Sequence, residues 1–312
     1  MSVRAVQSLK LSQLRLIAAI DRHRQIIHAA EALGISQPAA SRSLAEIERL
    51  LDAALFDRHP RGMTPTAAGE IVARRAHALL TGLSDLGREL DEMGDGLSGV
   101  VRVGAVTGPA LGCVVPALRH LKALAPRIEI AVEVAPSAAL LTLLEQGALD
   151  FLLARVPDGH PADGLRVEPG VAETLCCLIR RSHPLAGRDG VPMAEAARYP
   201  WVLQDRGAPI RVAVERAFWA EGLDPPADIT ASSSPLLALA LVQDTDALCP
   251  VSAEVARLAQ GEGHRFTTLS LARPFELSPC QLISRAARSL SPAAERMRAL
   301  VREEIARSGQ GR

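Results

Sequence analysis

One apolar seam constrains the fold of this chain more than any other feature. Between residues 72 and 93 the apolar positions follow one another in steps of 4, 3, 4, 3, 4 and 3. An average step of 3.5 keeps one stripe of a helix facing a partner along its length, which is typical of a coiled coil. We therefore predict a dimerisation helix over residues 67–94. The predicted interface residues are Val72, Leu79, Leu83, Leu86 and Leu90.

A helix that packs on its own domain is the alternative interpretation of this segment. Gly82 and Gly87 favour that alternative, because glycine weakens a helix interior. In both cases the helix separates two parts of the chain. A length of 312 residues has room for about two domains, and 48 % apolar residues can fill their cores.

Three short amphipathic helices are predicted before the seam, between residues 14 and 51. Their apolar positions recur at helical spacing. Between the second and third helices, Gly34 can take a left-handed turn and Ser36 can cap the next helix. Pro38 then falls in a first turn, where its missing N–H costs nothing. Two helices joined by so short a turn form a helix-turn-helix, here over residues 26–45.

The third helix has one face suited to DNA. At about 100° per residue, Ala40, Leu44, Ile47 and Leu51 share one side. The other side carries Gln37, Pro38, Ser41, Arg42 and Ala45. Arginine can bind guanine and glutamine can bind adenine in the major groove, and small residues allow close approach. The alternative is an ordinary solvated surface, but the preceding turn and the following hairpin favour DNA recognition.

The predicted hairpin covers residues 55–66 and contains a Pro/Gly turn, so it forms a wing beside the helices. Net charge for the whole chain is zero, so contact with DNA must come from a local patch. Residues 1–66 hold nine Lys/Arg against six Asp/Glu, which fits phosphate contacts by Arg58 and Arg61. The carboxylates of Glu46 and Glu48 are expected on a solvent face.

After the seam, the residues at 94–99 match the sequence of the dinucleotide fingerprint G-x-G-x-x-G but not its structural context. That fingerprint needs a strand before it and a helix after it, whereas here a helix precedes and a strand follows. A flexible linker is the better interpretation. Beyond it, strands and helices alternate in a pattern that predicts a parallel α/β fold. Strands are expected near 99–106, 128–135, 150–156, 174–179, 201–203, 229–231, 247–250 and 281–284, and later helices over 210–221, 235–243 and 292–306.

The run AAEALGISQPAASR at residues 29–42 resembles the helix-turn-helix of LysR-type transcriptional regulators. Three later blocks stand where that family has L-E-x-x-L-G, L-F-x-R and L-T-x-x-G. They begin at Ile47, Leu55 and Met63. The close resemblance covers residues 9–69, with Asp52 in place of a glycine and Met63 in place of a leucine.

This resemblance implies an α/β multidomain chain: a winged helix-turn-helix over 9–66, a linker helix over 67–94 and an effector domain over 98–312. The effector domain is expected to have the two-lobed, type II periplasmic-binding-protein-like fold. Expected partners are a double-stranded DNA operator, a small-molecule effector and further copies of the chain, as a homodimer or homotetramer. The implied DNA-binding residues are Ser36, Gln37, Pro38, Ser41, Arg42, Arg58, Arg61 and Thr64.

Small ligands in such folds sit where helix N-termini follow strand ends, since free N–H groups favour acceptor-rich molecules. The candidate effector-binding residues are Thr107, Ser137, Gln204, Ser232 and Ser233. Each could instead be a helix cap, because Ser and Thr are the usual capping residues. The block DTDALCP at 244–250 departs from the family's G-x-G turn, which puts the local shape of the cleft in doubt.

Other function classes find little support. No signal peptide or membrane span is expected, so we predict a cytoplasmic protein without membrane contact. No nucleophile elbow, P-loop or zinc-protease motif occurs, so neither an enzyme nor a cofactor nor a metal is expected. The five cysteines are interpreted as buried, reduced thiols. A solute-binding protein would account for residues 100–312 alone, and a ligand-independent architectural DNA binder stays open.

Overall fold

The computed structural model describes residues 7–60, 62–92, 99–157, 159–161, 164–261, 265–286 and 288–310. The chain forms two compact units. The first consists of Met1–Gly99 with Thr142–Asp150, and the second of Val100–Leu141 with Phe151–Arg312. Within the described residues, no helix has the length and apolar character that crossing a membrane requires.

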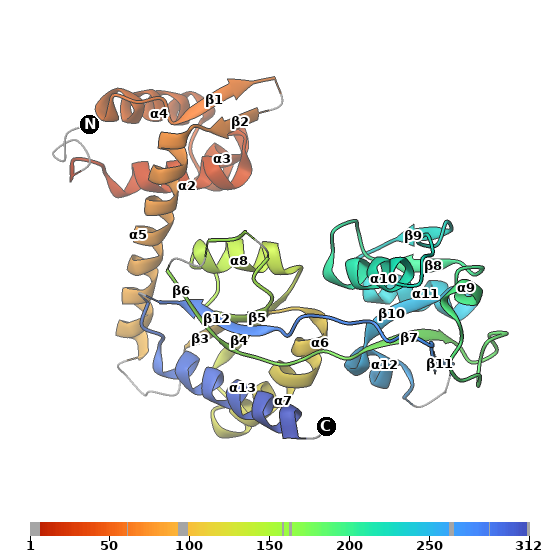
Figure 1. The fold of residues 1–312 in the computed structure, drawn as a ribbon. Helices are drawn as coiled ribbons and strands as arrows, with labels where there is room; N and C mark the ends of the chain where they lie inside the picture. The colour runs from red at the N-terminus through yellow and green to blue at the C-terminus, as the bar shows by residue number, and fades with distance from the viewer. Residues whose placement is uncertain are drawn as a thin grey trace. The chain divides into compact units, whose positions relative to one another are not determined.

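The first unit begins with the three predicted helices, α2 (Leu11–His23), α3 (Ile26–Ala32) and α4 (Gln37–Leu51) (Figure 1). Their apolar faces meet in one core, in which Ile17, Ile20, Leu44 and Ile47 have no exposed surface. Gly34 has a left-handed φ of 64°, as the turn before α4 requires. The helix-turn-helix prediction is therefore confirmed.

The predicted wing is a two-stranded hairpin of β1 (Phe56–His59) and β2 (Gly62–Pro65), in which Phe56 lies opposite Pro65. The hairpin is attached to the end of α2, because the N–H of Met63 donates to the carbonyl of Arg24 at 2.7 Å. A Cβ atom at Gly62 would lie 2.4 Å from that same carbonyl oxygen, so only glycine fits there. Met63, which replaces a leucine, is buried in the core of the helices.

The linker helix α5 (Ala67–Glu92) continues from the wing. Two of its polar residues, His77 and Thr81, are buried. His77 Nε2 lies 3.0 Å from Asp21 Oδ2 on α2, and Thr81 Oγ1 donates to the carbonyl of Gln146 at 2.9 Å. The helix is thus held by a side chain on α2 and by a backbone carbonyl on a turn far along the chain.

The second unit has two lobes, of which lobe I contains a five-stranded sheet in the order β4-β3-β5-β12-β6. The strands are β3 (Val100–Ala105), β4 (Glu129–Val134), β5 (Phe151–Ala154), β6 (Leu165–Pro169) and β12 (Gln281–Arg285). β3 runs parallel to β4 and β5, but β12 runs antiparallel to β5 and β6. The prediction of a parallel pattern is wrong for the strand expected near 281–284, because β12 returns from lobe II and not through a helix on the sheet.

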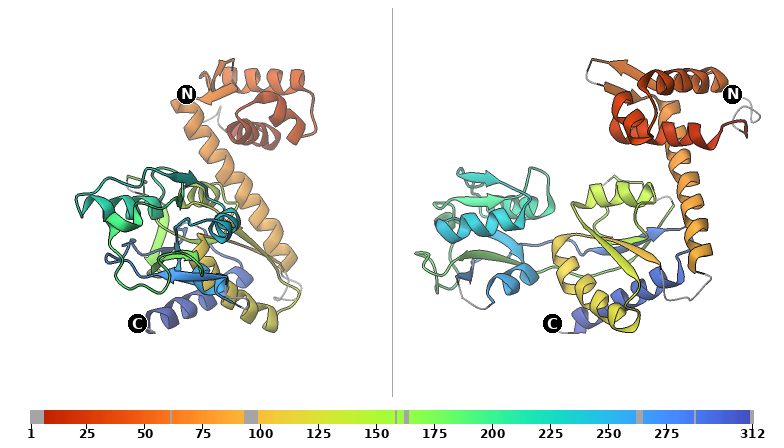
Figure 2. Two further views of the ribbon diagram at one scale, coloured as in Figure 1. Left: turned by 90° about the vertical axis from the view of Figure 1, so that its right-hand side faces the viewer. Right: turned by 180° about the vertical axis from the view of Figure 1, so that it is seen from behind.

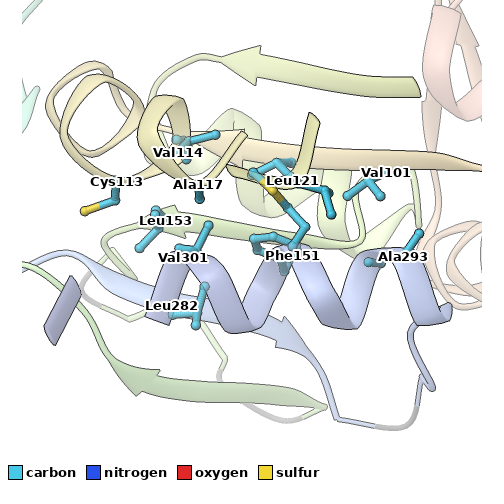
Figure 3. Packing of buried hydrophobic residues seen from close by; sticks show 14 of the residues in the cluster. Val101, Cys113, Val114, Ala117, Leu121, Phe151, Leu153, Leu282, Ala293 and Val301 are labelled. Atoms are coloured by element: carbon cyan, nitrogen blue, oxygen red, sulfur yellow. The ribbon is translucent and has the colours of Figure 1, made fainter. Parts of the chain in front are cut away.

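Helices cover both faces of this sheet. The continuous run of α6 (Thr107–Pro109), the π-helical η1 (Ala110–Val114) and α7 (Val115–Leu124) shares one face with α13 (Pro292–Gln310) (Figure 2). Strand and helix residues interlock there, including Val101, Phe151, Leu153, Leu282, Val114, Leu121, Ala293 and Val301 (Figure 3). The N-terminal half of α8 (Ser137–Glu145) lies on the opposite face.

Lobe II contains a three-stranded antiparallel sheet and a parallel pair. The prediction of a parallel pattern is therefore also wrong for the strands expected near 174–179 and 247–250, which pair with each other antiparallel. The antiparallel sheet has the order β10 (Cys249–Ser252), β7 (Leu175–Arg180), β11 (Phe266–Leu269), and β8 (Trp201–Leu203) pairs with β9 (Ile229–Ala231). The helices are α9 (Met193–Ala196), α10 (Pro209–Trp219), α11 (Pro235–Asp244) and α12 (Ala253–Ala259). Trp201 is fully buried, with its ring centroid 5.5 Å from that of Phe218. The sequence pattern did not predict β6, β11, α9 or α12, which are short.

Two chain segments connect the lobes, one between β6 and β7 and the other between β11 and β12. They lie side by side, because the N–H of Cys280 donates to the carbonyl of Val171 at 2.8 Å. A Cβ atom at Gly170 would lie 2.2 Å from the carbonyl oxygen of Cys280. Only glycine therefore allows the two segments to approach so closely.

Candidate DNA-binding face and effector site

Helix α4 buries one face completely and exposes the other. Ala40, Leu44, Ile47 and Leu51 are at most 1 % exposed. On the opposite face, the side chains of Gln37, Pro38 and Arg42 are exposed and that of Ser41 is half-buried. Short and polar side chains on a face that projects from a rigid core are what close approach to the floor of the major groove requires.

Residues at both ends determine where α4 begins and ends. Ser36 Oγ accepts the N–H of Ala39 at 3.4 Å, and Pro38 lies in the first turn. At the other end Asp52 has a left-handed φ of 50°, which aspartate tolerates better than most residues. Asp52 therefore takes over the conformation that the family's glycine would supply.

Glu48 corrects one prediction. It was expected on a solvent face, but it is half-buried and its Oε1 accepts the N–H groups of Leu55 at 2.8 Å and Phe56 at 3.3 Å. This carboxylate joins α4 to the first strand of the wing. Glu46 is exposed, as expected.

The wing presents two of the predicted phosphate-contacting residues. Arg58 and Thr64 are exposed on β1 and β2, where Arg58 lies opposite Met63. Arg61, also predicted, lies outside the described residues, as do residues 94–98 of the predicted linker.

The apolar seam of α5 divides into two parts. Val72 and Ala76 pack against the core of the helix-turn-helix. Further along, Leu79, Leu83 and Leu86 are 56 %, 49 % and 52 % exposed. Met93 and the side chain of Leu90 lie outside the described residues. A row of half-exposed leucines is the surface that a partner helix would cover.

In lobe I, the candidate effector residues lie at the carboxyl ends of adjacent parallel strands. Thr107 begins α6 directly after β3, and Ser137 begins α8 after β4. Ser137 is buried, and its Oγ accepts the N–H of Arg155, which follows β5, at 3.2 Å. Three strand ends therefore meet at one edge of the sheet.

In lobe II, Gln204 follows β8 and Ser232 follows β9, and the N–H of Ser232 donates to the carbonyl of Leu203 at 2.8 Å. Helix α11 is capped by Ser234, whose Oγ accepts the N–H of Leu237. Ser232 Oγ accepts the N–H of Ser234, and Ser233 is exposed. Thr107 and Ser137 thus follow the ends of two paired strands in lobe I, and Gln204 and Ser232 follow the ends of two paired strands in lobe II.

A buried ion pair beside Ser137 was not predicted. Arg155 Nη2 lies 2.5 Å from Glu173 Oε2, and these side chains are 10 % and 6 % exposed. Arg155 Nε also donates to the carbonyl of Ser278 at 2.6 Å. One side chain therefore binds both segments that connect the lobes. In the sequence, Arg155 lies near the end of the strand predicted at 150–156, and a charged residue in an otherwise apolar strand was the available signal.

The cysteines are free, and four are buried while Cys176 is half-buried, in agreement with their interpretation as reduced thiols. Burial raises the pKa of Cys113 to about 11 and that of Cys249 to about 12. Burial and the charge of Glu173 raise the pKa of Cys280 well above its usual range. These thiols therefore remain protonated near neutral pH and are weak nucleophiles.

A winged helix-turn-helix joined through a long helix to a two-lobed α/β domain defines a ligand-responsive, DNA-binding regulator. Residues 11–70 match the family described as bacterial regulatory helix-turn-helix protein, lysR family, and residues 94–306 match the LysR substrate binding domain. The chain belongs to the LysR family of transcriptional regulators. It is a DNA-binding regulator with an effector-binding domain, and the family is not one of enzymes.

Similar proteins share the whole architecture. The transcriptional regulator GbpR of Azospirillum brasilense is 36 % identical over 94 % of this chain and 86 % of its own length. An SDS degradation transcriptional activation protein of a Pseudomonas species is 33 % identical, covering 96 % of this chain and 97 % of its own. Among solved structures, full-length CbnR in complex with its target DNA has a TM-score of 0.63 at 21 % identity, covering 95 % of this chain and all of CbnR. A full-length OxyR variant from Pseudomonas aeruginosa has a TM-score of 0.64 at 21 % identity, covering 95 % of this chain and 94 % of OxyR.

Proposed function

We propose that this regulator reads operator DNA with the exposed face of α4 and that the wing holds the phosphate backbone. The observation that carries the proposal is the contrast between the two faces of α4. The residues of one face are at most 1 % exposed, and the other face carries short or polar side chains. The proposed contact residues are Ser36, Gln37, Pro38, Ser41, Arg42, Arg58, Arg61 and Thr64. The full-length CbnR structure with its target DNA, similar in fold, supports this role.

We further propose that the effector is a small, acceptor-rich molecule bound in the sensor domain by Thr107, Ser137, Gln204, Ser232 and Ser233. The meeting of three strand ends around Ser137 supports this site, since polar groups at the carboxyl ends of parallel strands commonly bind ligands. The proposed domains are 9–66, 67–94 and 98–312. The protein would act in the cytoplasm, where its operator is found.

Dimerisation completes the proposal. The seam residues Val72, Leu79, Leu83, Leu86 and Leu90 would pair α5 with the same helix of a second chain, as a homodimer or within a homotetramer. The exposed leucines of α5 support this arrangement. Pairing two chains would place two copies of α4 on a two-fold operator.

The test is the substitution Arg42→Ala. We expect specific operator binding to weaken by about 1 to 3 kcal/mol while binding to random DNA persists, because a base contact discriminates and a phosphate contact does not. Arg22→Ala on α2 is the matched control, since Arg22 is also exposed. Affinities for operator and random duplexes are measured at one salt concentration. Equal losses on both duplexes would show that Arg42 contacts only phosphate.

A further inference from the structure

A cavity of about 380 Å³ that is wide open to solvent lies in lobe II at one end of its three-stranded sheet. It is lined by Arg180, Arg181, Ser182, Gln243 and Arg265. Three of these five side chains carry a positive charge and none is acidic. None of them belongs to the proposed DNA-binding, effector-binding or dimerisation sets, so the function described above leaves this cavity unexplained.

Two of the arginines lie directly opposite each other. Phe266 pairs with Arg180 in the antiparallel ladder of β7 and β11, and the N–H of Arg181 donates to the carbonyl of Arg265 at 2.8 Å. Arg181 and Arg265 are therefore cross-strand neighbours. Such neighbours have Cβ atoms about 5 Å apart, and like charges there destabilise the sheet.

The charges of this pair are not offset within the described part of the chain. Both side chains are exposed, and no carboxylate among the described residues forms an ion pair with Arg181 or Arg265. An anion held between the two guanidinium groups would supply the missing counter-charge. Arginine suits this task because its planar fork matches the oxygens of phosphate and carboxylate.

The third arginine is held in place at the cavity. Asp246 Oδ1 accepts from Arg180 Nε at 3.0 Å and from Nη2 at 2.7 Å, while Nη1 donates to Ser182 Oγ at 2.6 Å. Since Ser182 Oγ accepts this bond, its own proton is free to point elsewhere. The hydroxyl of Ser182 adds a donor to the wall of the cavity, and Gln243 Nε2, which donates one N–H to Asp244 Oδ1 at 3.5 Å, has a second N–H to offer.

We propose that this cavity is a second ligand site of the sensor domain, and that it binds a small dianion carrying a phosphate group. A dianion balances the charges of Arg181 and Arg265 together, whereas a monocarboxylate balances only one of them. The open cavity of about 380 Å³ has room for an anion of this size. Inorganic phosphate and the phosphate of a metabolite share this chemistry.

The test is calorimetric titration of the full-length protein with inorganic phosphate and with glycerol phosphate, at pH 8 and constant ionic strength. We expect saturable binding of one anion per chain for at least one of the two probes, and the probe that binds distinguishes the sources. Acetate should bind at least about tenfold more weakly, a difference of about 1.4 kcal/mol. The double variant Arg181→Gln/Arg265→Gln should lose at least about tenfold in affinity.

The matched control is Arg206→Gln/Arg273→Gln, which removes two exposed charges of lobe II that do not line the cavity. It should keep its affinity within about twofold. The single variant Arg181→Gln provides the same readout if the double variant does not fold. Absence of saturable binding below about 10 mM, or equal losses in both double variants, would overturn the proposal. Thr107→Val/Ser137→Val should still bind the probe, so failure of the effector site would be recognised separately.

Discussion

At the scale of single residues, Asp21 holds the helix-turn-helix to the linker helix. Its carboxylate lies 3.0 Å from His77 Nε2 and 3.2 Å from Arg24 Nη2, and it is 16 % exposed. The hydrogen bond from His77 lowers the pKa of Asp21 below its ordinary value, more than burial raises it. A lowered pKa means that the folded state favours the ionised carboxylate.

We therefore expect the contribution of Asp21 to the free energy of unfolding to depend on pH. The contribution is present above the unfolded pKa of about 4 and is lost as pH falls through the lower folded value. Asp21→Asn should reduce the free energy of unfolding by about 1 to 2 kcal/mol at pH 7, and by less at pH 3. Urea unfolding followed by circular dichroism at both pH values measures this. Asp57→Asn, exposed on β1, is the control; an Asp21→Asn loss that is equal at pH 7 and pH 3 would contradict the assignment.

Residues of this kind mark a limit of prediction from the sequence. The periodicity of Ala40, Leu44, Ile47 and Leu51 correctly identified the buried face of α4. It could not identify the partners of Glu48, because a helical period tells which side is buried but not which backbone N–H groups lie opposite. The ion pair of Arg155 and Glu173 could not be predicted for the same reason, since the two residues are 18 positions apart in the sequence and lie on different segments of the fold.

At the scale of elements, the apolar seam of α5 consists of a buried part and a half-exposed part. Its first turns belong to the core of the helix-turn-helix, whereas Leu79, Leu83 and Leu86 are about half exposed. Exposed apolar area costs about 25 cal/mol per Å², so covering a row of leucines provides a substantial driving force for pairing. The seam was visible in the sequence because the period of 3.5 persists beyond the part that the core needs.

Leu83→Arg tests the pairing of α5. An arginine at a covered seam position would be buried without a partner, so we expect monomers at micromolar concentration and loss of tight binding to a two-fold operator. Leu236→Arg on α11 is the control, because Leu236 is 80 % exposed. Sedimentation velocity measures the assembly. A Leu83→Arg variant that sediments as wild type would place the interface elsewhere.

At the scale of the whole molecule, the order of the elements was more predictable than their pairing. Strands 99–106, 128–135 and 150–156 were placed closely, since each is a short segment of mostly apolar residues. The antiparallel insertion of β12 between β5 and β6 was not, because strand order depends on contacts between residues more than a hundred positions apart. The candidate effector residues were chosen because they follow strand ends. Strand ends indicate which residues lie at the same edge of one lobe, but they do not tell how far a residue of lobe I lies from a residue of lobe II.

The sensor prediction belongs at this scale. Thr107→Val/Ser137→Val should abolish the response to whichever compound of a metabolite library raises the wild-type melting temperature, because two hydrogen-bonding groups are lost at one sheet edge. Operator binding without the compound should not change, since α4 and the wing are untouched. The exposed strand residues of lobe II provide the control Thr230→Val/Thr268→Val. An unchanged midpoint of the response in gel-shift titrations would show that the effector binds elsewhere.

The position of β12 also determines the order in which the molecule can be completed during translation. Lobe I begins at Val100 but needs β12 and α13, which end at Arg285 and Gln310. The lobe that starts first is therefore finished last, after all of lobe II has left the ribosome. A chain that stops before residue 281 would contain the whole winged helix-turn-helix, but its lobe I would lack β12, which lies between β5 and β6 in the sheet. Such products would keep the proposed DNA-binding face but lack a complete effector domain.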